Sequence, residues 1–236
     1  MRALAQAVRF LTVLPWPGVP REPEEGDMES ALVRFPFVGL LMGAILIALD
    51  WALASSFSVS VRSAALIVAL VVLTRGISLS GLSDFADMLR SGDHAREGIT
   101  GSMGVPIIIG ALLLKFVALN ELHGYERYLA LLVSLIIARA AMAYLIAASP
   151  SAQRAGDGNH EFARPSRPRE GHIALGWSFL LCFLLAWFWG LFLAIVAFCV
   201  TWGLRRLLDK SEKVVKDAPG ATSEIVEIMT LVLYST

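Results

Sequence analysis

Apolar residues dominate the chain in long runs, separated by shorter polar segments. A bilayer core about 30 Å thick needs roughly 20 mostly apolar residues per helix. The run over 173–204, about 32 residues, is too long for one span without strong tilt, so we expect two helices that turn near Gly190. The pattern therefore predicts membrane spans, from first to last, over about 32–54, 63–77, 105–122, 128–148, the two halves of 173–204, and a weaker one over 221–234.

Basic residues are unevenly distributed over the segments that connect these spans. They gather in 75–101, in 149–172 and after Gly203, whereas the other connections are nearly bare. With seven spans these three segments lie on the same side as the N-terminus, and with six spans they do not. Because cytoplasmic loops carry an excess of Lys and Arg, we predict seven spans with a cytoplasmic N-terminus and a C-terminus on the other side.

The first 20 residues predict an amphipathic helix at the membrane interface rather than a cleaved signal peptide. Arg9 interrupts the apolar residues of this segment, and no clean small-residue cleavage site follows it. A helix whose charged and apolar residues separate onto two faces lies in the plane of the interface. The predicted fold class is thus all-α, a polytopic integral membrane protein of about seven transmembrane helices with an N-terminal interfacial helix, in a single domain over 1–236.

Composition supports a membrane protein and excludes several other classes. Hydrophobic residues make up 56% of the 236 residues and charged residues 17%, with a mean hydropathy of +0.66, whereas a soluble domain carries about 25% charge. Two cysteines exclude a disulfide scaffold. The 20 basic and 20 acidic residues cancel, so net charge does not indicate nucleic acid as a partner. The lack of internal repeats disfavours a transporter built from two related halves.

The densest group of polar residues follows the second predicted span and contains Asp84 and Asp87. On a helix, residues three apart share a face, so their oxygens can reach one hard cation together. This spacing makes Asp84 and Asp87 candidate metal ligands. The alternative is a helix start in which both carboxylates are hydrated or cap the helix.

Further candidate residues lie in the same polar segment, 75–104, which we interpret as an acidic, glycine-rich cytoplasmic active-site loop. Glu97 precedes a glycine-rich turn that contains Gly101 and Gly104 and leads into the third span. Backbone amides at such a helix start can bind a phosphate group. The alternative is a flexible loop without a ligand.

Charged residues within or beside the later spans could complete this site. Lys115 and Arg139 lie inside predicted spans, where a cation either pairs with acids or receives an anionic ligand. Asp217 and Glu224 flank the start of the last span, where they either stabilise the helix dipole or contribute to a polar site. Carboxylates, a glycine turn and cations at one membrane level are typical of metal-assisted phosphoryl transfer.

Most of these residues belong to motifs through which the sequence resembles the cobalamin synthase family, the adenosylcobinamide-GDP ribazoletransferases. The resemblance covers most of the chain and rests on the order and spacing of the motifs. They are FLTVLP at 10–15, FPFVGLLMG at 35–43, GLSDFAD at 81–87, GSMG at 101–104, KF at 115–116, ARAAM at 138–142 and GATSE at 220–224.

The resemblance implies a transferase of vitamin B12 nucleotide-loop assembly in the cytoplasmic (inner) membrane, with its active site facing the cytoplasm. α-Ribazole, or its 5′-phosphate, attacks GDP-activated adenosylcobinamide and GMP leaves. It further implies Mg²⁺ as the cofactor and is compatible with a homo-oligomer. The implied catalytic residues are Asp84, Asp87 and Glu97, with Asp84 and Asp87 as metal ligands. The implied substrate- and phosphate-binding residues are Gly101, Gly104, Lys115, Arg139, Asp217 and Glu224.

The sequence departs from the family pattern within the acidic motif. Ser78 and Ser80 stand where the family usually has a His and an Asp, and Met88 stands where a glycine is usual. A serine hydroxyl replaces a carboxylate ligand of Mg²⁺ poorly. Two alternatives therefore stay open: a catalytically impaired, corrinoid-binding relative, and a phosphotransferase acting on another nucleotide-activated alcohol. The chain lacks the D-G-x-x-A-R pattern typical of CDP-alcohol phosphotransferases.

Overall fold

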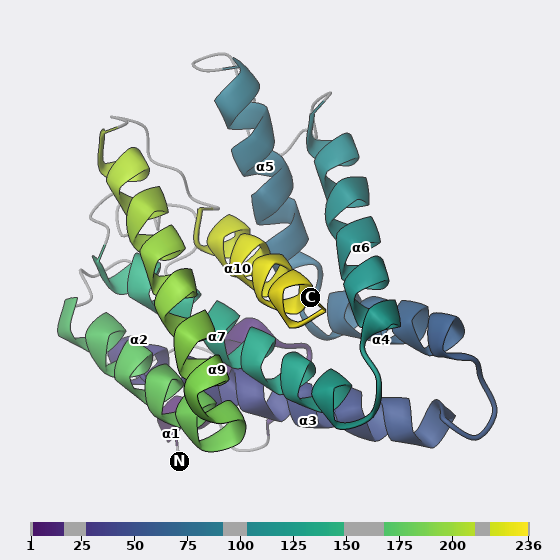
Figure 1. Ribbon diagram of the computed structural model, residues 1–236. Helices are drawn as coiled ribbons and strands as arrows, with labels where there is room; N and C mark the ends of the chain where they lie inside the picture. The colour runs from purple at the N-terminus through teal and green to yellow at the C-terminus, as the bar shows by residue number, and fades with distance from the viewer. Residues whose placement is uncertain (1, 17–26, 92–102, 149–167, 211–217, 236) are drawn as a thin grey trace.

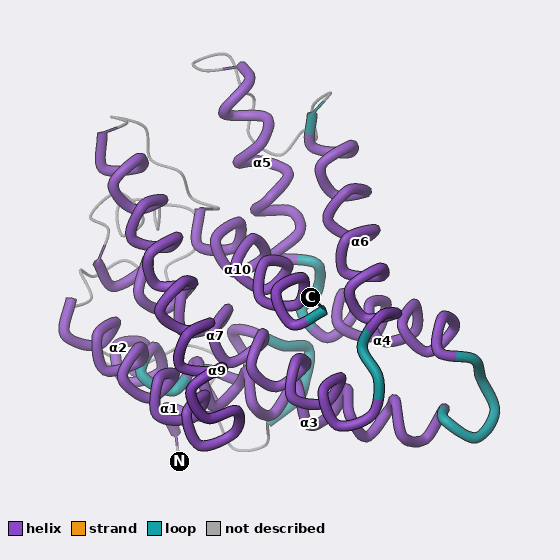
Figure 2. Tube along the Cα trace, in the orientation of Figure 1, coloured by secondary structure: helices purple, strands orange, loops and turns teal. Residues whose placement is uncertain are grey.

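The structure, a computed structural model, describes residues 2–16, 27–91, 103–148, 168–210 and 218–235. This part of the chain is helical with short connections and contains no strand (Figure 2), which confirms the predicted all-α class. The helices are α1 (Arg2–Leu11), α2 (Asp27–Leu32), α3 (Phe35–Leu53), α4 (Val59–Leu73), α5 (Ile77–Ser91), α6 (Gly104–Glu121), α7 (Gly124–Ala148), α9 (Pro168–Lys210) and α10 (Ala218–Tyr234).

Helix α7 forms the centre of the bundle and packs against α3, α9 and α10 (Figure 1). Its side chains are buried along almost the whole length from Ala130 to Ala148, as expected for a helix that is apolar on all sides. Gly39 and Gly43 of α3 allow the closest approach to it. A Cβ atom at Gly39 would overlap the carbonyl oxygen of Leu135, which explains the small residues at this spacing.

The chain bends by 86° between α4 and α5. Arg75 and Gly76 make this bend with positive φ angles of 56° and 65°, a conformation that glycine adopts at little cost. Helix α5 then extends along α6 and α10 (Figure 1). Gly220 of α10 lies so close to the start of α5 that an added Cβ atom would be 3.2 Å from the carbonyl oxygen of Ile77. The bend therefore brings the acidic motif beside the last helix.

The long apolar run over 173–204 is divided near Gly190, as predicted. Non-helical backbone angles occur at Ala186 and Trp187 within α9, about one turn before Gly190. An added Cβ atom at Gly190 would overlap the carbonyl oxygen of Cys182. The glycine thus permits close packing across the break rather than making the turn itself.

Four helices, α3, α6, α7 and α9, are long and apolar enough to cross a membrane, and the bent pair of α4 and α5 would make a fifth. The described residues therefore contain the apolar helices of a multi-pass membrane protein. The predicted count of seven spans is not confirmed. By this measure α9 counts once despite its break, and α10, at 17 residues, is too short.

The N-terminal segment is helical over α1, shorter than the predicted 1–20. Its apolar face is buried against the protein, with Ala7 and Val8 fully enclosed, and α1 packs on α2 and α3. The Phe10 ring stacks on Phe35 of α3 at 5.8 Å between centroids. The apolar face of this helix is therefore covered by the helix bundle and not by lipid alone.

Candidate active site

Asp84 and Asp87 lie on helix α5, which corrects the prediction of a loop over 75–104: residues 77–91 are helical. The two residues are one turn apart, with Asp84 half-buried and Asp87 buried. Residues three apart on a helix share a face. The helix therefore places both residues on one side of α5, as their spacing predicts, and their role as metal ligands stays a prediction.

Asp87 also has a structural role, because its side chain caps the start of α6. The Asp87 Oδ1 atom accepts hydrogen bonds from the backbone amides of Met103 and Gly104, at 3.0 and 3.1 Å. These are donors that a helix start leaves without intrahelical partners. The sequence predicts a phosphate group at the Gly104 amide. Such a group would have to share this amide with the Asp87 carboxylate or displace the carboxylate from it.

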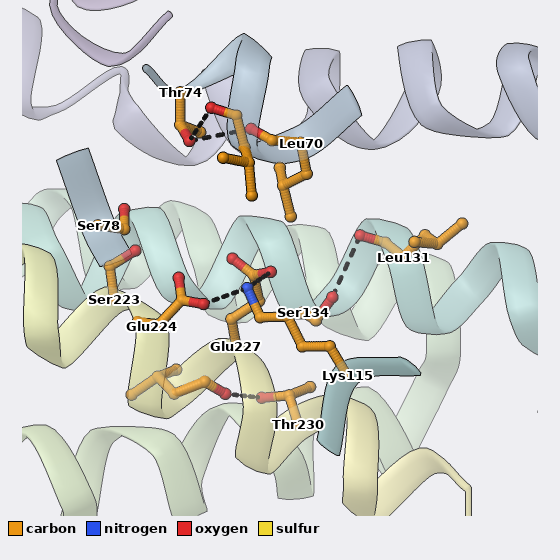
Figure 3. A network of polar contacts seen from close by, with 12 residues as sticks. Leu70, Thr74, Ser78, Lys115, Leu131, Ser134, Ser223, Glu224, Glu227 and Thr230 are labelled. Carbon is orange, nitrogen blue, oxygen red and sulfur yellow. Dashed lines mark hydrogen bonds and ion pairs between the residues drawn. The ribbon is translucent and has the colours of Figure 1, made fainter. Parts of the chain in front are cut away.

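Lys115 of α6 pairs with two carboxylates of α10. Pairing with acids is one of the two alternatives that the sequence left open for this residue. Its Nζ atom lies 2.5 Å from Glu224 Oε1 and 2.6 Å from Glu227 Oε1 (Figure 3). All three side chains are buried. Charges removed from water need such partners, since desolvation penalises an unpaired ion heavily.

Arg139 of α7 belongs to the same group. Its guanidinium donates to the hydroxyls of Ser223 and Ser78, at 2.8 and 3.2 Å, and lies 3.9 Å from Glu227 Oε2. Ser78, a position where the chain departs from the family pattern, thereby connects the first turn of α5 to α7. We call Lys115, Arg139, Glu224 and Glu227 the buried charge cluster.

The buried charge cluster is balanced and closed in this structure. Two cations face two carboxylates, so the formal charges cancel. The void beside it, lined by Thr74, Ser78 and members of the cluster, has a volume of about 10 Å³, room for one water molecule and not for a phosphate group. As arranged here, Lys115, Arg139 and Glu224 do not line an open substrate site, and their predicted substrate contacts stay a prediction.

Glu227 is the member of this cluster that sequence reasoning did not assign to a site. The available signal was its spacing, because Glu224 and Glu227 are three apart and face the same side of α10, toward Lys115 (Figure 3).

A second group of buried ions lies on α3, α4 and α7, away from the acidic motif. Asp50 Oδ1 lies 3.0 Å from Arg127 and 3.2 Å from Arg62. Arg127 also donates to Ser63 Oγ, at 3.1 Å, and to the backbone carbonyl of Leu119. Both arginines lie within helices, Arg62 in α4 and Arg127 in α7, and link helix ends, which is a structural role.

Ser80 lies on the same face of α5 as the two aspartates, at helical spacings of four and seven residues. Its side chain is exposed and donates to the carbonyl oxygen of Ile77 at 3.0 Å. An acidic residue at this position would therefore extend the stripe formed by Asp84 and Asp87. The other predicted site residues, Glu97, Gly101 and Asp217, lie outside the described residues.

The described residues contain no group of three or more His, Cys, Asp or Glu side chains that could hold a metal ion. Two carboxylates one helical turn apart are nevertheless a suitable donor set for Mg²⁺, which proteins bind through one or two carboxylates together with substrate phosphates. Asp84 and Asp87 therefore suit a cation whose remaining ligands come from the substrate, and not a site in which the protein supplies every ligand.

Comparison with known proteins identifies the relatives of the chain. The sequence profile described as cobalamin-5-phosphate synthase matches residues 3–235. A protein from a Pseudomonas fluorescens strain named adenosylcobinamide-GDP ribazoletransferase is 32% identical over 95% of both chains. One of the same name from a Roseiflexus species is 31% identical over 97% of this chain and 87% of its own. No solved structure matches the chain.

Proposed function

Because this chain belongs to the cobalamin-5-phosphate synthase family, we propose that it catalyses the reaction for which its relatives are named, adenosylcobinamide-GDP ribazole transfer. A hydroxyl oxygen of α-ribazole, or of its 5′-phosphate, attacks the phosphorus atom next to cobinamide. The new P–O bond forms as the P–O bond to GMP breaks, and the attacking hydroxyl loses its proton. The products are adenosylcobalamin, or its 5′-phosphate, and GMP.

The observation that carries this proposal is the family match over nearly the whole chain, together with the two carboxylates that α5 presents within the matched motif. Phosphoryl transfer depends mainly on positioning and on neutralising charge. Helix α5 is well held for this purpose: Ser78 ties its start to Arg139, and Asp87 ties its later turns to the beginning of α6.

We further propose Mg²⁺ as the cofactor, held by Asp84 and Asp87 together with the diphosphate of the substrate. When bound, it would neutralise negative charge on the phosphates during transfer. The fit of two neighbouring carboxylates to this ion supports the proposal. Glu97 and Asp217 are proposed as supporting acidic residues on the basis of the sequence.

The protein is proposed to lie in the cytoplasmic membrane with the acidic motif facing the cytoplasm. The basic segments around this motif support that orientation. The later turns of α5 and the beginning of α6 lie at the same end of the molecule, as the Asp87 hydrogen bonds require (Figure 1). A soluble nucleotide-activated substrate could reach this end from the cytoplasm.

Purified protein incubated with adenosylcobinamide-GDP, α-ribazole and Mg²⁺ tests the function directly. We expect release of GMP in amounts equal to the cobalamin formed, and loss of both when Mg²⁺ is chelated. The departures at Ser78 and Ser80 favour a second candidate, a corrinoid-binding relative without turnover. Binding of adenosylcobinamide-GDP with no GMP release would identify that candidate and reject the proposed reaction.

A further inference from the structure

A cavity of about 660 Å³ lies at the end of the molecule away from the acidic motif. It opens between the connection from α6 to α7, the break in α9 and the end of α10. Helix α6 lies between this cavity and the backbone amides that Asp87 caps. With 18 residues at roughly 1.5 Å per residue, the helix is about 27 Å long. The cavity therefore belongs to a different site, close to a bilayer thickness from the candidate active site.

Acidic and aromatic side chains give this cavity its chemical character. Glu121 and Glu126 line it together with the rings of Tyr125, Trp187 and Trp189, and no described lysine, arginine or histidine lines it. Neither glutamate forms an ion pair within the described part of the chain. Carboxylates beside aromatic faces are the combination that binds an organic ammonium group.

Two further features of the lining indicate a site that is built to receive a ligand. Tyr234 lines the cavity, and its hydroxyl oxygen is buried without a hydrogen-bond partner among the described residues, whereas buried polar atoms are nearly always satisfied. Trp187 has a φ angle of 48°, a backbone conformation that costs free energy for a residue other than glycine and concentrates at functional sites.

We propose that this cavity binds the ammonium headgroup of a zwitterionic phospholipid of the phosphatidylethanolamine type. The cavity lies at the ends of α6 and α7, two of the helices able to span a membrane. Tryptophan and tyrosine at such ends lie at the level of the lipid headgroups. An ammonium group would face Glu121 and Glu126 there, and its lipid would stay in the adjoining leaflet.

Native mass spectrometry of the detergent-purified protein tests this inference. The full-length protein is mixed with equal amounts of phosphatidylethanolamine and phosphatidylglycerol that carry identical acyl chains. We expect ethanolamine lipid adducts to exceed glycerol lipid adducts about fivefold, because only the former carries a cation for the carboxylates and rings. Equal adducts would show a general aromatic belt without a headgroup site and would overturn the proposal.

Variants locate the preference in the cavity. Glu121→Gln combined with Glu126→Gln should reduce the excess to about one, and Tyr234→Phe should reduce it in part, since it removes only the unpartnered hydroxyl. Glu29→Gln on α2 is the matched control and should keep the excess. A preference that survives in the double variant would place the lipid elsewhere. Displacement of the lipid by millimolar free ethanolamine would identify a soluble amine as the ligand and reject the lipid.

Discussion

Asp87 caps a helix in the structure and is also a proposed metal ligand, two roles that the sequence left as alternatives. Its spacing from Asp84 suits a shared cation, and its Oδ1 atom caps the first turn of α6. A carboxylate that accepts two backbone amides is held in one orientation, which is what a ligand position needs. For the same reason, substitutions at Asp87 and Asp84 should have different consequences.

Asp84→Asn should abolish Mg²⁺-dependent GMP release, because it removes one of the two proposed metal ligands. Asp87→Asn should lose activity and also about 1 kcal/mol of stability, since a neutral amide oxygen is a weaker cap than a carboxylate. Parallel GMP assays and thermal denaturation separate the two effects. Full activity of Asp84→Asn would remove this residue from the site.

Lys115 should be important for stability. Lys115→Met leaves Glu224 and Glu227 buried beside a single remaining cation, Arg139. Removing one partner of a buried ion pair costs about 3–5 kcal/mol, which denaturant unfolding in detergent would measure. The double variant Lys115→Met with Glu224→Gln restores the balance of charge and should recover part of the loss. A double variant as unstable as the single one would contradict this explanation.

Ser80→Asp tests the position at which this chain lacks a family carboxylate. The exposed Ser80 side chain lies on the stripe of Asp84 and Asp87, so a third carboxylate should lower the Mg²⁺ concentration needed for half-maximal GMP release. Without the cation, the acids repel one another, so the metal-free melting temperature should fall. Ser55→Asp, at an exposed position between α3 and α4, is the control. An unchanged half-saturation point would show that residue 80 does not face the metal.

At the scale of elements, close contacts between helices depend on small residues at a few positions. Gly39 and Gly43 bring α3 onto α7, Gly220 brings α10 onto α5, and Gly190 brings together the two parts of α9. Each contact fixes the distance between two helices. The bend at Arg75 and Gly76 has the same importance, because it directs α5 toward α6 and α10.

Gly190→Ala should destabilise the protein by about 1–3 kcal/mol, because the new methyl group would overlap the Cys182 carbonyl oxygen and force the two parts of α9 apart. Gly203→Ala is the matched control in the same helix. No atom lies within 4 Å of a Cβ added there, so alanine should be neutral or stabilising by up to about 1 kcal/mol. Equal melting temperatures for the two variants would show that α9 does not pack closely at Gly190.

For the whole molecule, the orientation in the membrane follows from the distribution of basic residues. The N-terminus, the acidic motif and the segment after α9 are predicted to face the cytoplasm, and the break in α9 is predicted to lie on the other side. The cavity lined by Glu121 and Trp187 would then also face away from the cytoplasm.

Cysteine labelling of intact cells tests this orientation. In a background with Cys199→Ser, Trp187→Cys should react with an impermeant thiol reagent from outside, and Ser211→Cys should react only after the membrane is opened. Cys182 is buried and can stay. The seven-span topology requires one membrane crossing between these two positions. Labelling of both from the same side would therefore rule out the count of seven spans.

The helical fold and the Asp84–Asp87 pair followed from the sequence because hydropathy and a spacing of three residues are properties of single segments. The order of the motifs likewise indicated the family. Only the tertiary structure showed that Lys115 meets Glu224 and Glu227, that Asp87 caps α6, and that the break in α9 falls at Ala186 and Trp187. Periodicity predicts that a face is buried but not which other face covers it, because that depends on bends and close approaches between segments far apart in the chain.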